Sequence, residues 1–217
     1  LNETYTLANG IQIPKVGFGT WQIPAGETAY TAVSNALKNG YRHIDTAFAY
    51  GNEADVGKAI RDFGIARSEV FVTTKLPSTI KTYEGTLESF ESSFQNLNIG
   101  TVDLYLIHAP WPWNEVGKQC DEGNREVWRA MEKLYQEGRI RSIGVSNFTV
   151  RDLENIRSNA AVIPMVNQIR YYVGFAQPNT IEYCQEQEIL IEAYSPLATG
   201  GLLNNEAMLS IAEHYKV

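Results

Sequence analysis

The chain has 217 residues, and 18 lysines and arginines against 25 aspartates and glutamates give it a formal net charge of −7. Hydrophobic residues make up 44% and charged residues 20%, an ordinary globular composition that excludes disordered and fibrous classes. The acidic balance argues against a nucleic-acid partner, which normally meets a basic surface. Without an apolar run of membrane-spanning length or a secretory signal, we expect no membrane partner and a cytoplasmic protein.

The two cysteines are Cys120 and Cys184, and neither belongs to a C-x-x-C or a Cys/His cluster. Such clusters are the usual sequence signal of structural zinc or of a disulfide framework. The sequence therefore predicts two free thiols and no metal site.

The first structural signal is the dipeptide Asn9-Gly10, which lies between two short segments of alternating polarity within residues 5–14. Asn-Gly is the strongest short-range signal of a β-hairpin, because both turn residues tolerate a positive φ. We expect a small hairpin to open the chain.

After the hairpin, short apolar runs alternate with longer amphipathic stretches. The predicted strands start 24 to 38 residues apart and cover 16–19, 43–45, 70–75, 102–108, 140–145, 165–168 and 189–194. This spacing leaves room for a strand, a helix and two loops in each unit. The order indicates a repeated βα arrangement with parallel strands.

The stretches between the strands have helical periodicity. Apolar residues at i, i+3, i+4, i+7 and i+8 recur in 29–37 and 127–135, and shorter stripes occur in 56–63 and 208–215. Thr149 and Asp152 resemble a capping box at the start of another helix. The expected helix ends are marked by glycines that adopt the left-handed conformation easily, namely Gly40, Gly64, Gly100 and Gly138.

Parallel βα units form either an open doubly wound sheet or a closed (β/α)8 barrel. An open dinucleotide-binding sheet should show G-x-G-x-x-G in its first turn, but the segment that starts at Gly17 lacks the third glycine. We therefore expect a TIM barrel with an N-terminal hairpin, forming one domain over residues 1–217. Because eight units need about 250 residues, we also expect the eighth βα unit to be absent from this chain.

Four ionisable side chains lie at the ends of three successive predicted strands. Asp45, Lys75 and His108 end the strands, and Tyr50 lies in the loop five residues after Asp45. Each has an ordinary explanation when taken alone: a helix cap, a rim aromatic, a surface lysine and a core histidine. Their combination at neighbouring strand ends favours a site, since barrel active sites form at the carboxyl ends of strands. A tyrosine beside a lysine ammonium should have a lowered pKa and act as a general acid. Such a set suits protonation of a carbonyl oxygen.

Several longer motifs resemble those of the aldo-keto reductases, in unbroken order along almost the whole chain. They include Gly17-Phe-Gly-Thr-Trp21, Ile44-Asp-Thr-Ala-Phe-Ala-Tyr50, Val102-Asp-Leu-Tyr-Leu-Ile-His108 and Ile143-Gly-Val-Ser-Asn-Phe148. The resemblance implies a (β/α)8 barrel that reduces a small-molecule aldehyde or ketone with NADPH, and NADH is not excluded. It also implies a C-terminal tail, which we expect to be absent from this chain. It also implies that Tyr50 is the general acid, that Lys75 and Asp45 tune it, and that His108 orients the carbonyl group.

The resemblance further implies where the cofactor lies. Ser146, Asn147 and Gln168 are expected to bind the nicotinamide carboxamide, and Tyr194 to stack on its ring. The remaining cofactor residues that it implies are Gly19, Thr20, Trp21, Asp45, Ser195 and Leu197. The loop after the seventh strand also suits the pyrophosphate on physical grounds, because barrel phosphate sites often use that region.

For the substrate, we expect contacts with Trp21, Tyr50, His108 and Trp111, and Trp113 of the same loop is a further candidate. The family often has a bulky residue directly after the histidine, whereas this chain has Ala109. That difference predicts either a wider pocket or one filled by Trp111. We expect a monomer and leave a dimer open.

Two alternatives to a reductase are open. A cofactor-binding barrel of this type can have a regulatory or structural role without significant turnover. An isomerase or hydrolase that uses His108 and Asp45 is a third hypothesis.

Overall fold

The structure is a computed structural model that describes residues 1 and 3–216. It begins with an antiparallel hairpin of β1 (Thr4–Thr6) and β2 (Gln12–Pro14), in which Tyr5 pairs with Ile13. The backbone N–H of Gly10 donates to the Leu7 carbonyl at 2.8 Å, and Gly10 has a φ of 85°. The hairpin predicted from Asn9-Gly10 is confirmed.

The main sheet has seven parallel strands whose spatial order follows their order in the chain. They are β3 (Phe18–Gly19), β4 (His43–Asp45), β5 (Phe71–Leu76), β6 (Val102–Ile107), β7 (Ile140–Ser146), β8 (Val166–Arg170) and β9 (Leu190–Tyr194). All seven predicted strands are present, with ends shifted by at most a few residues. Within the described residues, β3 and β9 are the two edges of this curved sheet.

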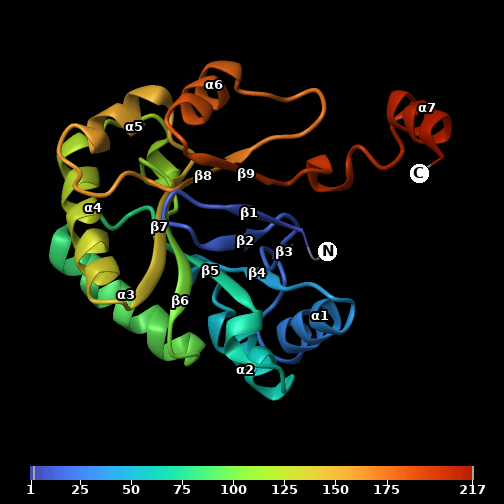
Figure 1. The fold of residues 1–217 in the computed structure, drawn as a ribbon, viewed down its shortest axis with the longest axis horizontal. Helices are drawn as coiled ribbons and strands as arrows, with labels where there is room; N and C mark the ends of the chain where they lie inside the picture. The colour runs from blue at the N-terminus through green and yellow to red at the C-terminus, as the bar shows by residue number, and fades with distance from the viewer. Residues whose placement is uncertain (2, 217) are drawn as a thin grey trace.

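Helices follow the strands and cover the outer face of the sheet (Figure 1). They are α1 (Glu27–Lys38), α2 (Glu53–Asp62), α3 (Tyr83–Leu97), α4 (Asp121–Gln136), α5 (Val150–Arg157) and α6 (Pro178–Glu186). A further helix, α7 (Glu206–Tyr215), follows β9 but does not cover the sheet. The capping box is confirmed at α5, where the Thr149 hydroxyl accepts from the Asp152 N–H and the Asp152 carboxylate accepts from the Thr149 N–H. The parallel βα architecture expected of a TIM barrel is confirmed.

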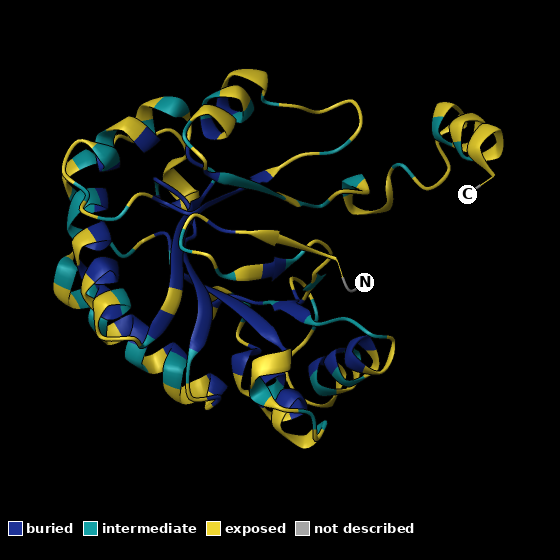
Figure 2. Cartoon of the chain, viewed as in Figure 1, coloured by how far each residue is buried: buried dark blue, intermediate teal, exposed yellow. Residues whose placement is uncertain are grey.

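The core lies between the strands and the inner faces of the helices. Every residue of β5 and β6 is buried, and Figure 2 shows the central strands in the colour of buried residues. The hairpin lies across the amino-terminal end of the sheet, where the Asn9 side-chain amide donates to the Arg141 carbonyl at 2.9 Å. The hairpin does not cover the opposite, carboxyl-terminal end of the sheet, where the polar side chains of the predicted site lie.

Helix α7 differs from the others, because none of its described residues is buried. Figures 1 and 2 show it apart from the sheet, at the end of an extended segment, and Leu209 and Ile211 are 53% and 50% exposed. Its apolar stripe, which predicted the helix correctly, therefore does not pack on the sheet. Among the described residues, no helix is both long and apolar enough to span a membrane.

The contact between α2 and α3 gives the first testable prediction. A methyl group added at Gly57 would lie 1.9 Å from the Leu97 carbonyl oxygen, so the two helices cannot keep their spacing. We expect Gly57→Ala to lower the free energy of unfolding by about 1–3 kcal/mol, despite the better helix propensity of alanine. Urea denaturation measures the change.

The matched control is Lys58→Ala on the exposed side of the same helix, where Lys58 pairs with Asp62. We expect that variant to change stability by less than about 0.5 kcal/mol. Equal effects of the two substitutions would contradict the packing argument.

Candidate active site

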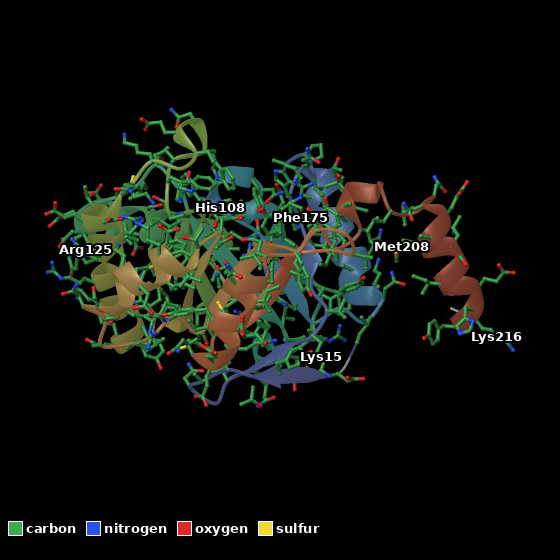
Figure 3. The ribbon with its side chains drawn as sticks, turned by 90° about the horizontal axis from the view of Figure 1, so that it is seen from above. Lys15, His108, Arg125, Phe175, Met208 and Lys216 are labelled. Atoms are coloured by element: carbon green, nitrogen blue, oxygen red, sulfur yellow. The ribbon has the colours of Figure 1, made fainter. Side chains whose placement is uncertain are left out.

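The four side chains predicted to act together do converge at the carboxyl-terminal end of the sheet. Asp45 ends β4, Lys75 lies near the end of β5, and His108 directly follows β6. Tyr50 ends the short 3-10 helix η1 (Phe48–Tyr50) in the loop after β4. Figure 3 shows His108 on the side of the molecule opposite the hairpin. Because the strands are parallel, their carboxyl-terminal ends lie at the same end of the sheet.

A buried ion pair forms the centre of the site. Lys75 is 1% exposed, and its Nζ donates to Asp45 Oδ1 at 2.5 Å and to the Thr46 carbonyl at 3.0 Å. Burial acts to lower the pKa of Lys75, but the negative charge of Asp45, together with that of Tyr50 in its phenolate form, outweighs burial, and the pKa is raised. The lysine is therefore held as an ammonium ion.

The tyrosine contacts both neighbours. The centroid of the Tyr50 ring is 5.2 Å from Lys75 Nζ and 5.7 Å from the centroid of His108, which meets it edge to face. Burial raises the pKa of Tyr50, Lys75 lowers it, Asp45 raises it again, and the net shift is upward. The predicted lowering is therefore wrong for this structure, because it considered the lysine and neglected the loss of solvent. A raised pKa keeps the phenol protonated.

His108 is a neutral imidazole. Burial, and secondarily the charge of Lys75, lower its pKa from 6.5 to about 3. Its Nδ1 atom is buried and has no hydrogen-bond partner among the described residues. A neutral ring with unsatisfied hydrogen-bonding capacity is suited to bind a polar group of a ligand.

The backbone after β6 is held by three side chains: one from the loop after β7, one from the connection between β5 and α3, and one from α4. Successive carbonyls of His108, Ala109 and Pro110 accept hydrogen bonds from Asn147 Nδ2 at 3.0 Å, Lys81 Nζ at 2.9 Å and Asn124 Nδ2 at 2.9 Å. Lys81 Nζ also donates to Asn124 Oδ1 at 2.8 Å, which joins two of them. The sequence carried no signal for Lys81 or Asn124, since they lie 28 and 14 residues from their carbonyl partners.

The residues predicted to bind the nicotinamide lie together at the ends of β7, β8 and β9. Tyr194 donates its hydroxyl to Asn147 Oδ1 at 2.8 Å, and Ser146 Oγ donates to the Gln168 carbonyl at 2.8 Å. Gln168 Nε2 donates to Asp45 Oδ2 at 2.9 Å, which links this group to the ion pair. Asn147 has a φ of 62°, and such strained backbone is typical of functional sites.

These groups fit a nicotinamide. Two side-chain amides and a hydroxyl supply the donors and acceptors that a carboxamide requires, and the Tyr194 ring, only partly buried, offers a flat apolar face. After β9, Ser195 is partly exposed and Leu197 is 54% exposed, so this loop presents a polar and an apolar group to solvent.

The segment after β3 contains one exposed residue at the site, Trp21, and one buried residue, Thr20. Trp21 is 54% exposed at the edge of the site, whereas Thr20 is fully buried and its N–H donates to the Asp45 carbonyl at 2.9 Å. Buried Asn52, to which the sequence assigned no role, donates to the carbonyls of Thr20 and Ile23 at 3.0 and 3.1 Å. These bonds fix the Thr20 backbone between Asp45 and Asn52, and so help to position the flanking residues Gly19 and Trp21.

Two tryptophans of the loop after β6 lie beside His108, and the nearer one contacts its ring. Trp113, which is 48% exposed, meets His108 edge to face at 5.8 Å, and Trp111 meets Trp113 at 4.9 Å. Ala109 is completely buried and cannot reach a ligand. The aromatic surface beside His108 is thus supplied by Trp113, with Trp111 behind it.

Comparison with known proteins identifies the family. The model of the "Aldo/keto reductase family" matches residues 15–214. The chain belongs to this family. A glyoxal reductase of Bacillus subtilis is 44% identical to it over 99% of this chain and 75% of that protein. A crystal structure of an aldo/keto reductase from Brucella melitensis, 46% identical, superposes with a TM-score of 0.89 and covers 99% of this chain and 79% of that one.

Membership of the aldo-keto reductases establishes the broad activity. This chain is an NAD(P)H-dependent oxidoreductase of the kind that reduces small-molecule carbonyl compounds, and the family assignment favours this activity over the isomerase or hydrolase hypothesis. Another relative, a mutant of Gox0644 solved in complex with NADPH, is 36% identical with a TM-score of 0.86 and covers 99% of this chain and 74% of that one. The roles of individual residues in this reductase stay predictions.

The low pKa of His108 gives a prediction that NMR can check. With a pKa of about 3, the ring stays neutral on acidification through the range in which an exposed histidine takes up a proton. The chain has three histidines, so the His108 signals can be assigned by comparison with His108→Gln. Protonation of His108 near its ordinary pKa of 6.5 would show that the ring is not desolvated as described.

Lys81 gives a prediction about stability and pH. Burial lowers its pKa from 10.5 to about 8, so the unfolded chain binds the proton more tightly than the folded one between these values. The contribution of Lys81 to stability should therefore rise with pH in this window, by about 1–2 kcal/mol between pH 7 and 9.5.

The difference in unfolding free energy between the native protein and Lys81→Met, measured by urea denaturation at several pH values, isolates this contribution. Lys118→Met, which removes an exposed lysine paired with Glu115 in the connection between β6 and α4, is the control and should give no such rise. A flat difference for Lys81→Met would mean that Lys81 is not desolvated.

Proposed function

We propose that the chain reduces a small aldehyde or ketone to an alcohol with NADPH, and that Tyr50 gives the proton to the carbonyl oxygen. The observation that carries this proposal is the convergence of Tyr50 on the buried Lys75–Asp45 pair and on neutral His108. When bound, NADPH supplies the hydride for the carbonyl carbon.

Each of the four side chains of the site has a separate role in this proposal. Tyr50 holds a proton because its pKa is raised, and the nearby Lys75 ammonium stabilises the phenolate that remains after the proton leaves. Asp45 keeps Lys75 charged and fixes its position through the bond of 2.5 Å. His108 donates a hydrogen bond that orients the carbonyl oxygen, and a neutral ring does so without competing as a stronger acid.

The cofactor is expected along the ends of β7, β8 and β9. Ser146, Asn147 and Gln168 bind the carboxamide of the nicotinamide, and Tyr194 lies against its ring. Trp21 and Gly19 border the same ring, while Ser195 and Leu197 cover the phosphates. NADPH is preferred over NADH in this proposal because a related reductase was solved in complex with NADPH.

The rival hypothesis is a barrel that binds the cofactor and turns over no carbonyl. The intact set of Asp45, Tyr50, Lys75 and His108 favours turnover, since a binding protein has no need of a buried lysine that stabilises a phenolate. Tight NADPH binding without oxidation by any of a broad panel of aldehydes would support the rival.

Substitution of the tyrosine tests the proposal directly. Tyr50→Phe keeps the ring and removes the proton, so we expect kcat to fall by about 10²–10⁴-fold in the NADPH-dependent reduction of glyoxal, followed at 340 nm. The affinity for NADPH, measured by quenching of protein fluorescence, should change little.

Tyr30→Phe is the matched control. It removes a hydroxyl that donates to Asp62 on the outer surface, at 3.1 Å, and should leave kcat unchanged. Full activity of Tyr50→Phe would assign the proton to another group.

A further inference from the structure

Arg170, at the carboxyl-terminal end of the sheet, differs from the other arginines because its side chain has no hydrogen-bond partner among the described residues. The chain has ten arginines, and nine of them donate hydrogen bonds to carboxylates, carbonyls or side-chain oxygens. In the part of the chain that the structure describes, the guanidinium of Arg170 makes no hydrogen bond or ion pair, and it lies against two aromatic rings. Its N–H donors are therefore available to a ligand.

Those two rings hold the guanidinium in place. Its central carbon lies 5.3 Å from the centroid of Tyr172 and 5.3 Å from that of Phe175, and the two rings stack on each other at 5.4 Å. A hydrogen-bonded turn, in which the N–H of each aromatic residue donates to the carbonyl of the other, fixes them. Aromatic faces bind a guanidinium without using its N–H groups, so the cation is positioned in advance for an anion.

The place of Arg170 in the sheet brings it to the site. It is the last residue of β8, pairs with Tyr194 of β9, and shares a face of the strand with Gln168 two residues earlier. Its charge reaches Tyr194, because it opposes the burial that raises the pKa of that phenol. Gln168 in turn bonds Asp45 at 2.9 Å, so the guanidinium lies at the same end of the barrel as the ion pair.

We propose that Arg170 binds the anionic group of the substrate, so that the preferred substrates are aldehydes or ketones that carry a carboxylate. The proposal rests on the reductase function given above and adds a substrate class to it. A carboxylate matches the paired N–H groups of a guanidinium, and a cation is needed to attract it in a chain of net charge −7. A cofactor phosphate has similar oxygens, so cofactor affinity must be measured separately.

Glyoxal and glyoxylate provide a matched pair of substrates, because both are two-carbon aldehydes and only glyoxylate is charged. We expect Arg170→Met, which keeps an apolar side chain against the rings, to lower kcat/KM for glyoxylate about tenfold and to leave that for glyoxal within twofold. Arg170→Lys should retain part of the preference. Added salt should weaken glyoxylate reduction by the native protein more than by Arg170→Met.

Arg151→Met is the control, since it removes an exposed arginine that pairs with Asp121 on the outer helices. Equal loss for both substrates, no loss for either, or a loss confined to NADPH affinity would overturn the proposal. Failure of the native protein to oxidise NADPH with either aldehyde would instead refute the proposed function, so the two failures are distinguishable.

Discussion

The structure of the site depends on a charge that has been taken out of water. An ammonium ion as buried as that of Lys75 is stable only if its desolvation is offset, and removal of one partner of such a pair typically costs about 3–5 kcal/mol. Asp45 and the Thr46 carbonyl supply the partners, and both belong to the strand next to β5 or to the residue that follows it. The pair therefore requires β4 and β5 to be in this register.

From this pair, contacts extend to both sides of the barrel mouth. On one side, Asp45 accepts from Gln168 and thereby connects to the amide and hydroxyl groups of β7 to β9. On the other, Lys75 lies against Tyr50 and lowers the electrostatic cost of its phenolate. The proton donor and the proposed nicotinamide site are thus organised by the same two charges, which explains why they occupy one end of the sheet.

Support for the site comes from polar side chains outside it. Asn52 ties the loops after β3 and β4 together, while Lys81 and Asn124 hold the segment that carries His108 and leads to Trp113. Each satisfies backbone groups that would otherwise be buried without partners. Irregular loops can position reacting groups within the required tolerance only when they are fixed in this way.

The sequence by itself determined the order and type of the elements and the four residues at the strand ends. Hydrophobic periodicity is a local property, and the carboxyl ends of parallel strands always lie at the same end of the sheet. Both inferences could therefore be made from the sequence alone. Only the tertiary structure decided that the pKa of Tyr50 is raised and that Lys81 binds the Ala109 carbonyl. It also decided that Trp113 lies against His108 and that the Arg170 guanidinium has no hydrogen-bond partner among the described residues. These depend on burial and on which side chains from different elements meet, and a local pattern does not contain that information.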